Sequence, residues 1–79
     1  MPLIMVVDDD QDLAEMLGIV LTSEGYEVNL VSRGDEVIQA FESQAPDLVL
    51  LDIMLPGIDG VKVCKLIREK SMVPIVMLT

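Results

Sequence analysis

Acidic side chains follow two of the apolar runs in this sequence, and a hydroxyl follows another. Asp8 and Asp9 come directly after the first run, Asp52 ends the third, and Thr79 ends the fourth. If these runs are parallel strands, their carboxyl ends meet at one edge of a sheet, which is where ligands bind in open α/β sheets. The sequence therefore predicts three carboxylates and a hydroxyl in one site.

Three carboxylates this close together repel one another unless a cation lies between them. Mg²⁺ prefers oxygen ligands in octahedral geometry and is usually shared with a phosphate group. A bound ion would screen Asp52 and let its carboxylate attack a phosphoryl donor, which forms an aspartyl-phosphate, and Thr79 could hydrogen-bond the phosphoryl oxygens. The alternative is that Asp9, Asp10 and Asp12 only stabilise the N-terminus of the helix that follows.

The elements that must position these side chains alternate between apolar runs and helical patterns. This alternation predicts a parallel sheet with helical crossovers, and the continuous apolar runs are typical of strands covered by helices on both faces. The second strand carries the polar residues Glu27 and Asn29 and is predicted to lie at an edge. The predicted strands are residues 3–7, 26–31, 48–52 and 74–78.

Three helices are predicted between the strands. The first runs from about Asp10 to Glu24 and is closed by Gly25, the second starts in a capping-box-like pattern at Ser32 and ends before Pro46, and the third has Asp59 as its N-cap. Their predicted core positions are Leu13, Met16, Leu17, Val20 and Leu21, then Val37, Ile38, Ala40 and Phe41, then Val61, Cys64, Leu66 and Ile67. Met5 and Met77 are predicted core positions on strands.

Composition bounds the function further. A chain of 79 residues with 52% hydrophobic content is one small domain at most. The net charge of −9 repels the phosphate backbone, which argues against direct nucleic-acid binding. The single cysteine, Cys64, cannot form an internal disulfide and is predicted to be a core residue. No targeting segment or membrane span is evident, so we expect a cytoplasmic protein.

Three motifs, taken in order, resemble the receiver domain of two-component response regulators, most of all the OmpR-type transcription-factor subfamily. They are VVDDD at residues 6–10, LLDIMLPGIDG at residues 50–60 and PIVMLT at residues 74–79. The resemblance spans the whole chain. It implies an α/β, doubly wound, flavodoxin-like parallel sheet in which the strands, numbered along the chain, lie in the order 2-1-3-4.

The resemblance also implies a role for each site residue. Asp52 becomes the phosphoacceptor, and Thr79 becomes the switch hydroxyl. Mg²⁺ is implied as the cofactor, with Asp9 and Asp52 as carboxylate ligands, Asp8 as a ligand through water, and the backbone carbonyl of Met54 as a further ligand. A histidine kinase is implied as the phosphodonor and a transcription factor as the output, so the module is expected to be a switch and not an enzyme.

The family's receiver has five βα repeats, so residues 1–79 correspond to its N-terminal part, without the fourth helix, fifth strand and fifth helix. The lysine and the aromatic switch residue of the fifth strand fall outside this part, which predicts impaired phosphorylation. The fourth strand is then expected to present an uncovered apolar edge that favours a homo-oligomer or a swapped dimer. The residues of that edge are Val73, Ile75, Val76, Met77 and Leu78.

Two other functions are weighed against a phosphoacceptor. A phosphatase of the haloacid-dehalogenase type also forms an aspartyl-phosphate, but it needs a second acid two residues after the nucleophile, where this chain has Met54. The second alternative is a structural or assembly fragment, an inactive receiver fragment that oligomerises. A phosphoryl adduct that depends on Asp52 would separate the phosphoacceptor from this alternative.

Overall fold

The computed structural model describes residues 1–55 and 57–78. Parallel strands form one four-stranded sheet in the order β2-β1-β3-β4, which confirms the predicted fold and strand order. The strands are β1 (Leu3–Val7), β2 (Glu27–Val31), β3 (Leu48–Asp52) and β4 (Ile75–Leu78). The α-helices are α1 (Gln11–Ser23), α2 (Val37–Gln44) and α3 (Gly60–Arg68), with a single 3₁₀ turn, η1 (Gly34–Glu36), before α2. Within the described residues, no helix is long and apolar enough to cross a bilayer.

The register of the sheet aligns the carboxyl ends of its strands. Val7 of β1 lies between Val31 of β2 and Leu51 of β3, and Asp52 lies beside Leu78 of β4. Because all the pairs are parallel, the residues that follow β1 and end β3 meet at the same rim of the sheet. This rim carries the candidate site.

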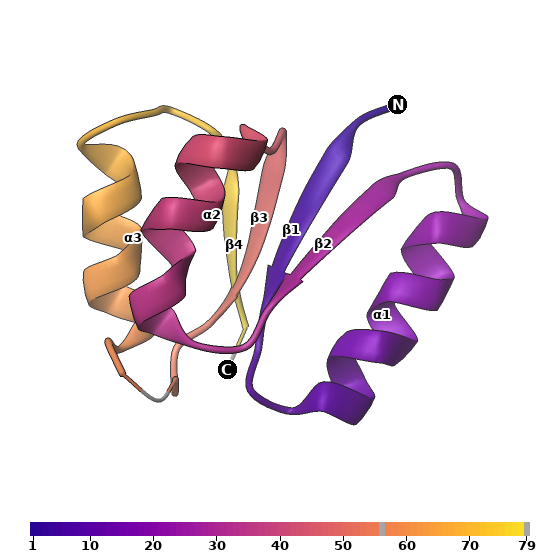
Figure 1. Cartoon of the computed structure of the whole chain (residues 1–79), viewed down its shortest axis with the longest axis horizontal. Helices are drawn as coiled ribbons and strands as arrows, with labels where there is room; N and C mark the ends of the chain where they lie inside the picture. The colour runs from indigo at the N-terminus through magenta and orange to yellow at the C-terminus, as the bar shows by residue number, and fades with distance from the viewer. Residues whose placement is uncertain (56, 79) are drawn as a thin grey trace.

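Helices α2 and α3 cover one face of the sheet, and α1 covers the other (Figure 1). The α2/α3 face holds the larger core, with partly buried side chains including Ile38, Cys64 and Met77 packed around it. Cys64, predicted to be a core residue, is partly buried and packs against this core. The buried residues of this cluster are Met5, Val7, Val31, Val37, Phe41, Val49, Leu51, Val63 and Ile67.

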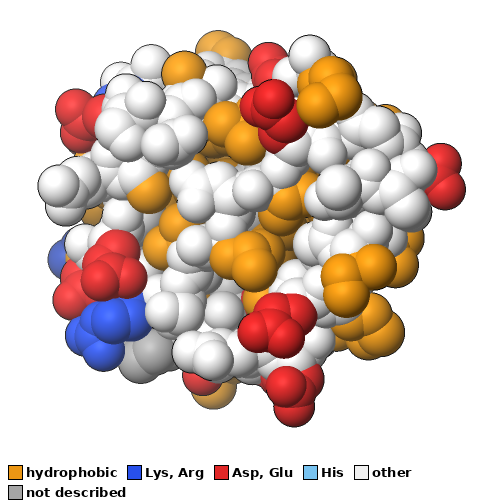
Figure 2. All heavy atoms as spheres, turned by 45° about the vertical axis from the view of Figure 1, so that its right-hand side comes forward, with side chains coloured by type: hydrophobic (Ala, Val, Ile, Leu, Met, Phe, Trp, Pro, Cys, Tyr) orange, Lys and Arg blue, Asp and Glu red, His pale blue; other side chains and the backbone are white. Residues whose placement is uncertain are grey.

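The α1 face has a smaller core, formed by Ile4, Val6 and Ala14. The prediction that the whole stripe of α1 is buried is wrong for its outer side, because Met16 is 56% exposed and Val20 is 51% exposed. Leu13 is exposed as well, whereas Leu17 and Leu21 do pack on this core. The reason is that α1 packs mainly on β2 and β1, which cover only its inner side. Figure 2 turns the α1 side forward and shows hydrophobic side chains at the surface in the hollows between acidic groups.

The ends of α1 and α3 agree with the sequence. Asp10 caps α1 by accepting a hydrogen bond from the Leu13 N–H at 3.2 Å, and Gly25 follows the helix with φ of 95°. Asp59 caps α3 by accepting one from the Lys62 N–H at 3.0 Å. Carboxylates are favoured at such positions because they satisfy N–H groups that have no partner within the helix.

Two details of the helices differ from the predictions. Ser32 does not cap α2: Arg33 precedes the η1 turn and makes no side-chain cap hydrogen bond, because the chain tightens into a 3₁₀ turn there first. On α3, Val61 is exposed and Val63 is buried instead. Val63 and Ile67, four residues apart, lie one above the other on the core side of α3 and define its inward face.

Candidate functional site

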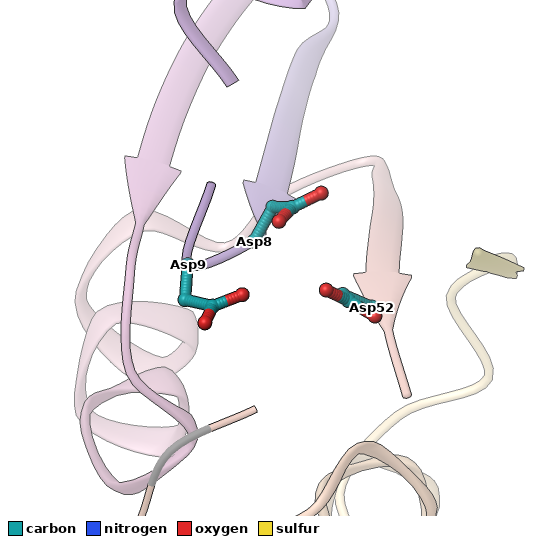
Figure 3. Close-up of side chains that lie close together, drawn as sticks. All are labelled: Asp8, Asp9 and Asp52. Atoms are coloured by element: carbon teal, nitrogen blue, oxygen red, sulfur yellow. The ribbon is translucent and has the colours of Figure 1, made fainter. Parts of the chain in front are cut away.

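The candidate site is a group of three carboxylates at the rim of the sheet. One oxygen each from Asp8, Asp9 and Asp52 lies within 4.8 Å of the others. Asp8 and Asp9 directly follow β1, while Asp52 is the last residue of β3, and Figure 3 shows the three side chains around a common space. Pairing of β1 with β3 therefore brings together acids from distant parts of the sequence.

Asp8 is the most deeply buried of these acids, with 4% of its surface exposed. Its N–H donates to the Val31 carbonyl at 3.0 Å, and its Oδ1 accepts from the Asp10 N–H at 2.9 Å. Burial raises the pKa of Asp8 above its usual value, and the charges of Asp52 and Asp9 act in the same direction, while the Asp10 N–H opposes them. The charged form of Asp8 is therefore disfavoured unless a cation compensates it.

Backbone hydrogen bonds fix the Asp52 carboxylate and the residue that follows it. Its Oδ1 accepts from the Met54 N–H at 3.0 Å, and the next residue, Ile53, donates its N–H to the Leu78 carbonyl at 3.2 Å. Asp52 is partly exposed and Asp9 is exposed, so the site runs from a buried acid outward to solvent. A reactant can reach Asp52 from this open side.

The glycines of the LLDIMLPGIDG motif hold the loop below Asp52. Gly57 has φ of 89°, a left-handed conformation that glycine adopts without steric cost. At Gly60, a Cβ would meet the Asp52 carbonyl oxygen and would lie 2.6 Å from the Ile53 Cα, so only glycine fits. Gly57 therefore serves the backbone conformation of the loop, and Gly60 serves its close packing against β3.

The remaining predicted residues separate into distinct groups. Asp10 and Asp12 belong to the start of α1, one as its N-cap and the other in its first turn, so the capping alternative holds for them and not for Asp9. The Met54 side chain is 78% exposed, and ligation by its carbonyl stays a prediction. Thr79, the predicted switch hydroxyl, lies outside the described residues, as does Pro56 of the second motif.

Sequence reasoning missed Gly34, which precedes α2. It is buried, and a Cβ there would meet the carbonyl of Ile58 in the loop between β3 and α3. No motif marks this glycine, and its φ is not one that requires glycine, so only the fold identifies it.

The donors of the site suit a hard divalent cation. The ion pairs found among the described residues are Arg33–Asp35 at 2.9 Å and Lys70–Glu42 at 3.6 Å, and neither includes a site acid. An all-oxygen group of converging carboxylates, one of them buried with a raised pKa, is the kind of set that binds Mg²⁺, Mn²⁺ or Ca²⁺. The three acids fit such an ion and could hold it from one side.

A known protein family matches nearly the whole chain. The family described as "Response regulator receiver domain" matches residues 4–79. The chain belongs to the response regulator receiver family. This assignment confirms the resemblance carried by the three motifs.

Curated members of this family give the scale of the match. The chain is 54% identical over 76 residues to the DNA-binding response regulator MtrA of Mycolicibacterium smegmatis, which covers 96% of the chain and 33% of the relative. It is 42% identical over 76 residues to the sensory transduction protein RegX3 of the same organism, with the same coverage. The chain thus spans about a third of the length of these receiver proteins.

Solved receiver structures share the fold closely. The N-terminal receiver domain of Klebsiella pneumoniae RstA, activated with BeF3, matches with a TM-score of 0.94 and 39% identity, over 98% of this chain and 66% of that one. Thermotoga maritima TrrA, in complex with Mg(2+)-BeF, matches with a TM-score of 0.85 and 44% identity, over 90% of this chain and 62% of that one. In both, more than a third of the solved chain lies outside the matched part.

Proposed function

We propose that residues 1–79 are the N-terminal part of a receiver domain that accepts a phosphoryl group on Asp52 in a two-component response regulator. The observation that carries this proposal is the convergence of Asp8, Asp9 and Asp52 within 4.8 Å at the rim of the sheet. Membership of the receiver family and the Mg(2+)-BeF complex of the similar TrrA support it. The module acts in the cytoplasm as a switch, not as an enzyme with turnover, and does not itself bind nucleic acid.

Each residue of the site has a defined part in the proposed transfer. Asp9, Asp52 and the Met54 carbonyl would hold Mg²⁺ directly, and Asp8 would hold it through water. When bound there, Mg²⁺ would supply positive charge to the acids and to the incoming phosphoryl group. Burial raises the pKa of Asp8, so a bound cation would favour its charged form.

The chemical step forms one bond and breaks one. A carboxylate oxygen of Asp52 attacks the phosphorus of the donor, a phosphohistidine of a histidine kinase or a small acyl phosphate. The bond from phosphorus to the donor breaks, and its electron pair leaves with the donor group. The Met54 N–H, 3.0 Å from Oδ1 of Asp52, orients the carboxylate for the attack. Thr79 would hydrogen-bond the transferred phosphoryl group as the switch hydroxyl.

The test is covalent and direct. The chain is incubated with Mg²⁺ and acetyl phosphate, and intact mass is measured for an added phosphoryl group. Asp52→Asn should abolish the adduct, whereas Asp47→Asn should keep it. Asp47 is a matched control because its carboxylate serves the opposite end of the sheet, where it accepts from the Leu3 N–H at 2.8 Å. Absence of an adduct on the wild-type chain, or an adduct that survives in Asp52→Asn, contradicts the proposal.

A second candidate function is assembly. The outer edge of β4 has no strand partner among the described residues, and Val76 on the α1 side of this strand is 47% exposed. An unpaired apolar strand favours association with another copy, so for residues 1–79 taken by themselves we propose a homo-oligomer or swapped dimer through this edge and the adjoining sheet face. Sedimentation over a range of concentrations tests this. A folded monomer at high concentration rules it out.

A further inference from the structure

The β3–α3 loop, residues 53–55 and 57–59, connects the proposed phosphoacceptor to the rest of the fold. At one end Ile53 donates its N–H to the Leu78 carbonyl at 3.2 Å, and at the other the Gly60 N–H donates to the Ile53 carbonyl at 2.8 Å. Within the loop, the Met54 N–H donates to Asp52. A shift of this loop therefore moves the backbone of Met54 relative to the Asp52 carboxylate.

A segment from another part of the chain presses against this loop. The backbone of Gly34 lies so close to Ile58 that a Cβ on Gly34 would contact the Ile58 carbonyl oxygen and would lie 2.9 Å from the Ile58 carbonyl carbon. Such a contact cannot be relieved by rotating a side chain, because the obstacle is backbone. Ile58 itself packs its side chain against the α2/α3 core, so it has little room to retreat.

The neighbours of Gly34 close over the same loop. The Arg33 Nε donates to the Asp35 Oδ1 at 2.9 Å, and the Arg33 Nη2 donates to the Asp35 Oδ2 at 3.1 Å. This ion pair lies against Gly57: a Cβ there would be 3.0 Å from the Asp35 Oδ1 and 3.4 Å from the Arg33 Nη2. The guanidinium of Arg33 holds the pKa of Asp35 below its usual range, so the pair stays charged at neutral pH.

We propose that Gly34 and the Arg33–Asp35 ion pair form a latch that positions the β3–α3 loop, and that this latch sets the affinity of the acidic site for Mg²⁺. The inference rests on the proposed function only in taking Mg²⁺ as the ion of the site. The residues of the latch touch neither the acids nor a reactant and act through the position of Met54. They are positioning residues.

Gly34→Ala is the main test, with two other glycines as controls. Gly18 has only ordinary contacts at 3.9 Å around an added Cβ, and Gly25 has open space but a φ of 95°, so Gly25→Ala strains the backbone without a clash. Mg²⁺ affinity is measured by titration calorimetry at a temperature at which circular dichroism shows each variant to be folded. We expect about tenfold weaker binding in Gly34→Ala, the scale typical of lost support around metal ligands. Both controls should bind Mg²⁺ as the wild type does.

Arg33→Gln provides a second test, because its electrostatic effect and its effect on loop position should change Mg²⁺ affinity in opposite directions. Loss of a positive charge should by itself strengthen Mg²⁺ binding to an acidic protein. Loss of the latch should instead weaken Mg²⁺ binding. We expect only about a twofold reduction in affinity, because about half of each side chain of the ion pair is exposed to solvent. If Gly34→Ala does not fold, Arg33→Gln decides alone.

The outcomes separate this inference from the proposed function. Wild-type Mg²⁺ affinity in both variants overturns the latch while leaving phosphorylation of Asp52 untouched. Weaker Mg²⁺ binding in the variants supports the latch even if acetyl phosphate gives no adduct, because the titration needs no transfer. A fall in Gly25→Ala equal to that in Gly34→Ala overturns the latch, since general destabilisation would then explain both. A wild-type chain that binds no Mg²⁺ contradicts both ideas.

Discussion

Among the described residues, nine side chains are buried in the core between the sheet and α2 and α3, whereas the core beneath α1 buries three. On the first face, Val63 and Ile67 of α3 are fully buried in this core. On the second, α1 covers β1 and β2, and Val76 of β4 stays half exposed. Within the described residues, the sheet is therefore held mainly from one side.

This asymmetry bears on the site because the β3–α3 loop belongs to the well-packed side. Leu55 and Ile58 of the loop pack against the larger core, and α3 begins immediately after it. The acids, by contrast, lie at the rim, where charge accumulates without a described ion pair. Packing on the α2/α3 face thus opposes the electrostatic repulsion that the site introduces.

The largest expected effect comes from adjacent leucines of β3 that point to opposite faces. Leu51 is fully buried on the α2/α3 face, and Leu50 packs partly exposed beside the smaller core. Leu51→Ala should lower the free energy of unfolding by about 3 kcal/mol, and Leu50→Ala by about 1 kcal/mol. Urea denaturation measures both. Equal losses would contradict the asymmetry between the faces.

Removing the negative charge of Asp8 should have a smaller effect on stability, and this effect should be stabilising. The raised pKa of Asp8 means that the native state binds a proton more tightly than the unfolded chain does. Its contribution to stability is therefore complete below the ordinary pKa of an aspartate and is lost as the pH rises through the raised value. Without Mg²⁺, Asp8→Asn should raise the unfolding midpoint at neutral pH.

The same variant also tests the cation. Thermal unfolding with and without Mg²⁺ is the measurement, and Mg²⁺ should stabilise the wild type more than Asp8→Asn. A midpoint that falls in Asp8→Asn without Mg²⁺ would show that the charged Asp8 supports the fold, against the raised pKa.

On the open part of the α1 face, Val76→Lys should change association more than stability. Val76 is half exposed, so the substitution should alter the free energy of unfolding by about 0.5 kcal/mol or less. A charge on this strand should oppose pairing between copies. Sedimentation of the wild type and the variant at equal concentration compares their average masses. Identical masses above that of a monomer would place the contact elsewhere.

The smallest effect is expected at Met16. Since its side chain is mostly exposed on α1, Met16→Gln should change the free energy of unfolding by no more than about 0.5 kcal/mol. Met5, fully buried on the other face, is the matched control, because Met5→Gln places an amide in the core and should destabilise by several times as much. Denaturation curves measured side by side decide this prediction.

Much of this fold was predictable because the strands carry their own signals. Continuous apolar runs and the acids that end them indicated a parallel sheet and the rim where these acids meet, and Asp10 and Asp59 marked helix starts by their capping chemistry. The order of the strands came from the family resemblance, since periodicity alone does not arrange strands. The sequence could not show which side of α1 is covered, because a helical stripe is apolar whether or not a neighbour lies against it.

The latch was equally invisible in the sequence. Gly34 has no unusual φ and lies in no motif, so nothing local distinguishes it from a glycine in an ordinary loop. Its importance arises from the backbone of Ile58, which reaches it only through the packing of the β3–α3 loop on the α2/α3 face. Contacts of this kind require the tertiary structure.

The parallel register also has a kinetic consequence. β1 meets β3 through pairs such as Ile4 with Leu48, so the long segment between them must be closed into a loop when these strands pair. Pairings between residues distant in sequence slow folding because loop-closure entropy is lost before the contacts form. Asp8 and Asp52 therefore come together as this pair closes. We expect Mg²⁺ to slow unfolding more than it accelerates refolding, which stopped-flow measurements of both rates would establish.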